Sequence, residues 1–314
     1  MTIEFVKLRG GMTVDVAMKQ IKRTGMDKET IYTCYVIDGQ RKLIGVVPLR
    51  TLICAKDEEL VQDLMEEDVV SVHTTDDQEE VAQIFKKYNW MALPVTDLEN
   101  RLVGIITVDD IVDVIEQETT EDMEKMAALL PSDEEYLKTP VLKLARNRIV
   151  WLCVLMVSGT LSSLVISHYQ TLLATVMALS SFITIITGTG GNAGSQASTM
   201  IIRGMALGEI EVKDVLRVVW KEVRVGALCG IALGAVNMVR MTFFSPSTGF
   251  LVDFTVSISM AAVVVLSKTI GCTLPILAKI LKADPAMMAG PLISTLVDAV
   301  ALILYFSIAT VLLM

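Results

Sequence analysis

The sequence predicts an α+β soluble region followed by an all-α membrane domain of five helices. The first observation is charge: residues 1–130 carry 14 Lys and Arg against 26 Asp and Glu, whereas residues 131–314 carry 13 against 10. The second is an internal repeat in the acidic half, and the third is a series of long apolar runs in the other half. An acidic soluble half, which would repel nucleic acid, therefore precedes a membrane half. We expect domain boundaries at 1–112, 113–136 and 137–314.

The acidic half contains two copies of one pattern. Residues 35–53 match residues 94–112 at a constant offset of 59, so that Asp38 corresponds to Asp97 and Gly45 to Gly104. Each copy predicts an amphipathic helix, two strands joined by a polar turn, and the start of a second helix. One copy cannot bury its own apolar face, so the two should pack as a single module. This α-β-β-α repeat resembles the paired CBS domain, a regulatory module of many channels, transporters and enzymes.

The CBS resemblance implies a nucleotide site. In that family, a Gly-x-x-Thr-x-x-Asp ending holds an adenine nucleotide such as ATP, and its Asp binds the ribose hydroxyls. The second copy has this ending, which makes Thr107 and Asp110 the expected nucleotide-binding residues, whereas the first copy departs from it at Pro48. The alternative is that Thr107 only caps the helix that begins at Val108.

The start of the chain also follows from the repeat. The second copy is preceded by the segment 59–72, and Met1 aligns near Met65. The first copy therefore lacks the helix that should precede it. We expect that an N-terminal domain is missing from this chain.

The connector at 111–130 is strongly acidic. It keeps a helical period and carries six acids between Asp113 and Glu124, followed by one base, Lys125. Carboxylates on one helix face are suitable ligands for Mg²⁺ or Ca²⁺, although a solvated linker helix would show the same pattern. A polar segment at 132–140 then separates the connector from the membrane half.

Five apolar spans are expected in the membrane half, at 149–167, 171–190, 223–243, 251–275 and 286–313. Lys and Arg gather before the first span and in the joints after the second and fourth, but the joints SHYQ and SPSTGF contain none. By the positive-inside rule, the basic joints and the CBS pair are cytoplasmic and the C-terminus lies outside. Pro275 and Pro291 are expected to end or kink their helices.

The last span carries a carboxylate, Asp298, inside an otherwise apolar run. Asp284 is a suitable N-cap for this span, and Pro285 suits the first helical position. A bare carboxylate at this depth is costly, so it must face water, a cation or a partner charge. The first interpretation is an ion path, and the alternative is a buried ion pair with Lys268 of the preceding span.

Two further patterns involve small residues. Gly188, Asn192 and Gln196 recur every four residues and share one helix face, and the two amides favour a pore wall over simple packing. A second pattern, Gly226, Gly230 and Gly234, forms overlapping GxxxG frames that we interpret as a packing seam and as weak support for a dimer.

The segments 188–210 and 283–306, following a CBS pair and an acidic connector, resemble the MgtE family of magnesium channels across essentially the whole chain. The resemblance implies a homodimer in the cell membrane, with five helices per subunit and an extra N-terminal helical domain. It implies that Mg²⁺ is both the permeant and the regulatory ion, and that Lys125 stands where another acid would be expected. The implied pore residues are Asp298, Asn192, Gly188 and Gln196, and the implied regulatory ligands are Asp284, Asp113, Glu116, Glu121 and Glu124.

The expected function is therefore Mg²⁺ import that is closed by Mg²⁺ bound at the cytosolic acids. Membrane lipid and a second copy of the chain are the expected partners. An enzyme is not expected, because His73 and His168 fall in different halves and no nucleophile–base set is apparent. Two alternatives stay open: a channel for another divalent cation, and a nucleotide-reading membrane sensor without transport.

Overall fold

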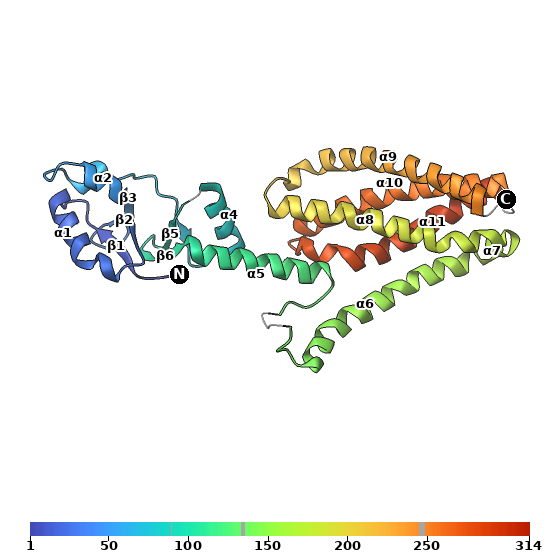
Figure 1. The fold of residues 1–314 in the computed structure, drawn as a ribbon, viewed down its shortest axis with the longest axis horizontal. Coiled ribbons are helices and arrows are strands. Elements are labelled where there is room, and N and C mark those ends of the chain that lie inside the picture. Colours follow the sequence, from blue (N-terminus) through green and yellow to red (C-terminus); the bar gives the residue numbers. More distant parts are fainter. Residues whose placement is uncertain (89, 133–135, 245–248) are drawn as a thin grey trace. The chain divides into compact units, whose positions relative to one another are not determined.

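The chain folds into two compact units, Met1–Thr119 and Thr120–Met314 (Figure 1). A computed structural model describes residues 1–88, 90–132, 136–244 and 249–314. The first unit is α+β and the second is helical, as predicted. The predicted polar segment 132–140 and the joint SPSTGF lie partly outside the described residues.

The first unit contains both copies of the repeat. Each copy forms a three-stranded sheet in which the first two strands are parallel and the last two form an antiparallel hairpin. The prediction missed the first strand of each sheet. These strands are too short for residue periodicity to reveal them. The elements are β1 (Phe5–Leu8), α1 (Val14–Thr24), β2 (Thr30–Ile37), β3 (Leu43–Pro48), α2 (Leu49–Cys54), α3 (Val61–Leu64), β4 (Val72–His73), α4 (Gln78–Tyr88), β5 (Ala92–Thr96), β6 (Leu102–Thr107) and α5 (Val108–Met126).

The hairpins confirm the predicted offset. Val36 pairs with Gly45 in one sheet, and Val95 pairs with Gly104 in the other. In each turn the aspartate at the matching position accepts two backbone N–H groups, at 2.7 and 2.8 Å for Asp38 and at 3.1 and 2.7 Å for Asp97. These Asp-centred turns fix both hairpins, because the carboxylate satisfies backbone donors that the turn leaves unpaired.

The two copies also pack as one module, as predicted. A core cluster takes members from both: Phe5, Tyr35, Leu43, Ala92, Leu102 and Ile105. The start of the chain takes part, because Thr2 bridges to Ile105 in the same way that Glu66 bridges to Val46. The predicted alignment of Met1 with Met65 is therefore visible in the backbone.

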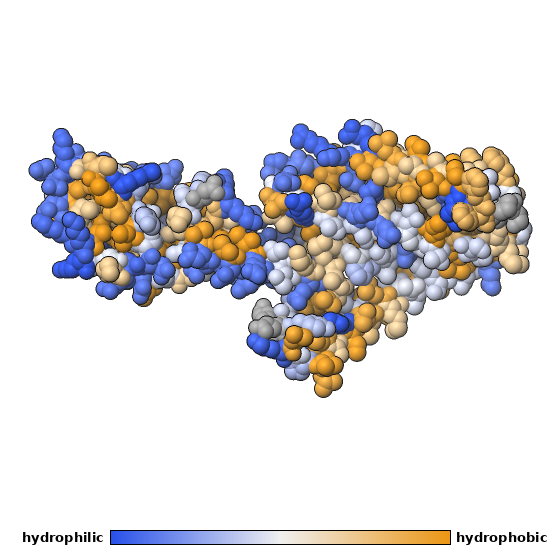
Figure 2. Space-filling model, viewed as in Figure 1, coloured by the Kyte–Doolittle hydropathy of each residue, from blue (hydrophilic) through white to orange (hydrophobic). Residues whose placement is uncertain are grey.

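The second unit is a bundle of long helices. Within the described residues, four helical stretches are long and apolar enough to cross a membrane: 141–168, 212–244, 250–280 and 285–313. Figure 2 shows hydrophobic residues spread over the surface of this unit, as expected of a lipid-facing surface. The elements are α6 (Val141–His168), α7 (Gln170–Thr175), α8 (Ile183–Ala206), α9 (Val215–Phe244), α10 (Phe250–Ile280), the short 3-10 segment η4 (Pro285–Met288) and α11 (Gly290–Leu313).

The predicted second span, 171–190, was wrong in its bounds. The chain is broken there into α7 and a 3-10 segment, Met177–Phe182, and the long helix α8 begins only at Ile183. Apolar content located the span too early, because α8 is rich in glycine, serine and amides and is helical through its packing against α10 and α11. Pro275 lies inside α10 without ending it, whereas Pro291 occupies the start of α11, where its missing N–H is tolerated.

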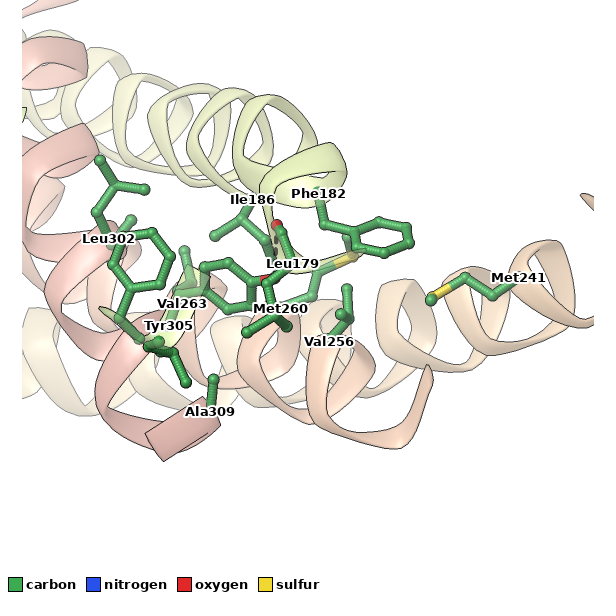
Figure 3. Close-up of a cluster of buried hydrophobic side chains, with 13 residues drawn as sticks. Leu179, Phe182, Ile186, Met241, Val256, Met260, Val263, Leu302, Tyr305 and Ala309 are labelled. Atoms are coloured by element: carbon green, nitrogen blue, oxygen red, sulfur yellow. Dashed lines mark hydrogen bonds between the residues drawn. The ribbon is translucent and has the colours of Figure 1, made fainter. Parts of the chain in front are cut away.

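One apolar cluster joins α8, α10 and α11 at one end of the bundle (Figure 3). Tyr305 of α11 is fully buried there, and its hydroxyl donates a hydrogen bond to the carbonyl oxygen of Leu179 at 3.0 Å. Val263 and Met260 of α10 pack against the same group. The cluster fixes α11 against α8 and so determines where Asp298 lies.

Glycines let the helices approach closely. A Cβ added at Gly230 of α9 would lie 2.6 Å from the carbonyl oxygen of Ala261, and one at Gly234 would lie 2.9 Å from that of Ser257. The predicted packing seam is therefore confirmed. It faces α10 of the same chain and therefore gives no support for a dimer, which stays a prediction.

We predict that Gly271→Ala destabilises the bundle. A Cβ at Gly271 of α10 would overlap the carbonyl oxygen of Gly194 in α8. Overpacking of this kind costs about 1–3 kcal/mol, so the midpoint of thermal unfolding in detergent should fall. Gly159→Ala is the matched control, because no atom lies within 4 Å of a Cβ added there. Equal melting behaviour of both variants would contradict this account of the α8–α10 contact.

Candidate functional site

Asp298 lies on α11, half-buried against α8. A Cβ added at Gly191 would lie 3.5 Å from Oδ1 of Asp298 and 3.5 Å from Oγ of Ser294. Glycine at this position therefore brings the α8 backbone close to the carboxylate. One turn along α8, Ser195 Oγ lies 3.3 Å from Ser294 Oγ, so hydroxyl oxygens continue the polar strip.

Asp298 has no protein partner within the described residues: it forms neither a hydrogen bond nor an ion pair there. The ion pair with Lys268 considered from the sequence is wrong. Lys268 of α10 instead lies 3.7 Å from Glu222 of α9. A carboxylate without a partner charge among apolar helices needs water or a cation, which leaves the ion-path interpretation of Asp298.

The predicted face of α8 is present. Gly188, Asn192 and Gln196 are all exposed, whereas Gly190 and Gly194 on the opposite side pack against α10 and α11. The three residues therefore form one exposed strip on α8. Exposed side-chain amides on a membrane helix need a polar neighbour, because lipid cannot form hydrogen bonds with them.

Sequence reasoning missed four residues of this region: Gly191, Ser195, Ser294 and Glu222. Two of them had a usable signal, because Ser294 precedes Asp298 by one helical turn and Ser195 follows Gly191 by one turn. Glu222 had no such signal in the sequence, because it lies in the basic joint before the third predicted span. Its role depends on the tertiary approach of α9 to α10.

The end of α5 is joined to the start of α11 by a lysine. Lys125 Nζ lies 2.6 Å from Oδ2 of Asp284 and also forms an ion pair with Glu121, one turn back on its own helix. Burial lowers the pKa of Lys125, but hydrogen bonds to Asp284 and Glu121, with the charges of both, outweigh it and raise that pKa. Asp284 also caps η4, as predicted for an N-cap, by accepting the Ala286 N–H at 2.8 Å.

Apolar contacts support the same joint. Met126, directly after the lysine, packs against Ile202, Ala286 and Ala289. The ion pair therefore lies beside an apolar contact that limits its exposure to water.

The predicted regulatory ligands do not gather into one cluster. Within the described residues, no group of three Asp, Glu, His or Cys side chains could hold a metal ion. Glu124 accepts the Ser132 N–H at 2.9 Å, and Asp284 and Glu121 are both engaged by Lys125. With Lys125 in place, these residues do not fit a Mg²⁺ site within one chain.

The soluble unit contains a cavity of about 470 Å³ that is lined by residues of both copies. Its lining includes Tyr32, Arg50, Asp68 and Trp90, but neither predicted nucleotide residue. Thr107 is buried at the end of β6, and Asp110 pairs with the amino group of Met1 at 3.2 Å.

Comparison with known proteins identifies the family. The family model MgtE, described as a divalent cation transporter, matches residues 183–308, and the CBS domain model matches residues 1–58 and 61–117. The magnesium transporter MgtE of Thermus thermophilus is 39% identical over 313 residues, which cover 100% of this chain and 69% of that protein. The chain belongs to the MgtE family of magnesium transporters. It is a membrane protein and not an enzyme.

Another relative gives the same family, and a solved structure resembles the soluble unit. The magnesium transporter MgtE of Enterococcus faecalis is 36% identical, over 99% of this chain and 67% of that protein. A crystal structure of the cytosolic domain of the Mg²⁺ channel MgtE in complex with ATP is 48% identical, with a TM-score of 0.36, and covers 36% of this chain and 46% of that chain. The transporters of Thermus thermophilus and Enterococcus faecalis match both units of this chain.

We predict that Lys125→Met loosens the joint between α5 and α11. Removal of the ammonium group leaves the carboxylates of Asp284 and Glu121 facing each other, so backbone amides at 121–129 and 284–289 should exchange hydrogen about two- to fivefold faster, the range expected for a partly exposed pair. Added Mg²⁺ should reverse the effect by screening those carboxylates. Lys213→Met is the control, because Lys213 forms an exposed pair with Glu211 at 2.6 Å. Unchanged exchange in Lys125→Met would contradict the assignment.

Proposed function

We propose that the chain conducts Mg²⁺ across the cell membrane, and that Asp298 binds the permeant ion. The observation that supports this most is a half-buried carboxylate on a membrane helix with no protein partner among the described residues. Oxygen atoms of Ser294 and Ser195 continue from it along the α8–α11 contact. Mg²⁺ is a hard cation that takes oxygen ligands in octahedral geometry, so this set suits it.

The proposal treats the ion as hydrated. Mg²⁺ loses water reluctantly, and a pore that passes it must bind it weakly enough for release. A carboxylate and neutral amides or hydroxyls can hold the waters of the ion without replacing them. Gly188, Asn192 and Gln196 are assigned to the wall of this path.

A second copy of the chain completes the path in this proposal. The strip formed by Gly188, Asn192 and Gln196 is exposed on the single chain, and lipid cannot pair with amide groups. A homodimer would cover both strips and bring two Asp298 carboxylates to one axis. Like charges brought together repel unless a cation lies between them, which suits an ion-binding position.

The proposed topology follows the basic joints. Lys and Arg gather before α6, between α8 and α9, and between α10 and α11, so these joints and the CBS pair are assigned to the cytoplasm and the C-terminus to the outside. Mg²⁺ would then enter down its electrochemical gradient. The acidic unit would be exposed to the Mg²⁺ that has entered.

Feedback closure is proposed at the connector. The acids Asp113, Glu116, Glu121 and Glu124 of α5, with Asp284, are the positions at which cytosolic Mg²⁺ would favour the closed path. In this chain, Lys125 supplies one positive charge to Glu121 and Asp284. We therefore infer that closure at this joint needs less Mg²⁺ than it would with an acid at position 125.

An adenine nucleotide is the proposed ligand of the CBS pair. The cavity of about 470 Å³ falls within the usual size of small-molecule sites, and Trp90 and Tyr32 give it aromatic walls. Thr107 and Asp110 remain the proposed ribose-binding residues of a second position. Two alternatives remain. A membrane sensor would bind nucleotide without transport, and a channel for another divalent cation would transport that ion in place of Mg²⁺.

We predict that Asp298→Asn abolishes Mg²⁺ flux into liposomes that contain the purified chain. The amide keeps the size of the side chain but removes the charge that attracts the ion, so flux should fall at least tenfold, since each 1.4 kcal/mol of lost interaction is a factor of ten. Asp214→Asn is the control, because Asp214 lies in the joint before α9, where Arg217 Nη1 donates to it at 3.4 Å.

The same liposomes test the alternatives. Millimolar Mg²⁺ on the CBS side should suppress wild-type flux. Equal flux of Mg²⁺ in wild type and Asp298→Asn would remove Asp298 from the path, and absence of flux in both would favour the sensor. Preference for another divalent cation over Mg²⁺ would favour the other channel.

A further inference from the structure

An open pocket with several polar side chains lies in the membrane unit, between α8, α9 and α10, and Ala197, Met200 and Val225 form the apolar part of its lining. Its volume is about 740 Å³. From α8 it receives the side chains of Asn192, Ser195, Gln196 and Thr199, and from α9 and α10 it receives Glu222 and Lys268. Two of these residues, Asn192 and Gln196, belong to the proposed pore wall, so the cavity opens beside the ion path.

The charged pair in this cavity is poorly matched. The side chains of Lys268 and Glu222 are only 8% and 15% exposed, yet their charged atoms are 3.7 Å apart. Within the described residues, Oε2 of Glu222 is buried and accepts no hydrogen bond. A buried ion pair is stabilising only when its remaining hydrogen-bonding capacity is satisfied, and here it is not.

The position of Lys268 is nevertheless built into the packing. A Cβ added at Gly226 of α9 would lie 3.6 Å from Cδ of Lys268. The missing side chain at Gly226 therefore gives room for the lysine stem. Packing of its stem against α9 thus helps to hold the ammonium group beside Glu222.

We propose that this cavity is a second binding site for a hydrated divalent cation, in which Glu222 is the acidic ligand and Lys268 is a tethered competitor. The donors are carboxylate, amide and hydroxyl oxygens, which suit a hard cation. Six waters occupy roughly 180 Å³ at their liquid volume, so an ion with its full hydration shell fits the cavity. The site deepens the proposed transport function, on which its role in permeation rests.

Lys268 determines how strongly the site binds. Its single positive charge neutralises the negative charge of Glu222 when no ion is present. An entering cation must therefore displace the ammonium group or bind against its repulsion. Affinity is therefore low, which allows an ion to leave toward the path at Asn192 and Gln196. Without Lys268, the carboxylate would be left buried and unpaired, and a cation would replace the lost charge.

Ion binding can be tested by melting the purified, detergent-solubilised chain with increasing Mg²⁺. A ligand that binds only the folded state stabilises it by RT ln(1 + [L]/Kd), so tighter binding gives a larger rise in melting temperature at a given Mg²⁺ concentration. Lys268→Met should melt below wild type without Mg²⁺ and regain stability as Mg²⁺ is added. Its apparent affinity for Mg²⁺ should be roughly tenfold higher than that of wild type, because removal of a nearby positive charge favours a bound cation by an amount similar to the effect of one charge on a neighbouring pKa. Lys268→Met combined with Glu222→Gln should lose this extra response, and Lys213→Met should respond like wild type.

The melting test needs no transport, so its failure is distinguishable from failure of the proposed function. Equal Mg²⁺ responses in all four proteins would contradict the proposed cation site and indicate that the cavity holds only water. If Lys268→Met does not fold, Glu222→Gln gives a second test in liposomes. It leaves Lys268 unneutralised beside the amides, so the Mg²⁺ concentration for half-maximal flux should rise several-fold at unchanged maximal flux. Addition of Lys268→Met should restore it in part, because the repelling ammonium group is removed while the carboxylate ligand stays absent. A purely structural pair would lower the amount of folded protein without this shift and without restoration.

Discussion

The membrane unit depends on one electrostatic constraint: a carboxylate placed among apolar helices must be compensated. Asp298 has no protein partner in the described part of the chain, and we propose that water or an ion compensates its charge. The fold provides the conditions for this. Gly191 brings the α8 backbone to Asp298, while the apolar cluster around Tyr305 holds α11 in register with α8. Small residues at one level of the bundle and large apolar residues at another thus both determine where the Asp298 carboxylate lies.

Two lysines act as internal counter-ions elsewhere in the same unit. Lys125 satisfies Asp284 and Glu121 at the joint of α5 and α11, with short contacts and apolar cover. Lys268 faces Glu222 at a longer distance, in a cavity, without a hydrogen bond. The difference is physical: the first pair is closely matched and favours a fixed joint, whereas the second leaves oxygen capacity for an entering ion. Neither lysine forms an ion pair with Asp298 within the described residues, which keeps its charge available.

Much of the architecture could be predicted from the sequence, because it depends on local patterns. The offset of 59 gave both hairpins, and the spacing of Gly188, Asn192 and Gln196 gave the exposed face of α8. The rest depends on contacts between distant segments. No pattern indicated that Lys268 would face Glu222, since the two are 46 positions apart in the sequence. The bounds of α8 were also misplaced, because its polar, glycine-rich sequence is helical only through tertiary packing.

The most direct test of the central claim is protection of a cysteine beside Asp298. Ser294→Cys, in a chain whose five native cysteines are replaced, would be treated with a water-soluble thiol reagent in liposomes. The account predicts rapid labelling that Mg²⁺ slows, and loss of that protection when Asp298→Asn is added. Ile303→Cys, exposed on the same helix, should stay unlabelled by such a reagent. Equal protection with and without the Asp298 carboxylate, or no labelling at position 294, would contradict the assignment of Asp298 to a hydrated ion path.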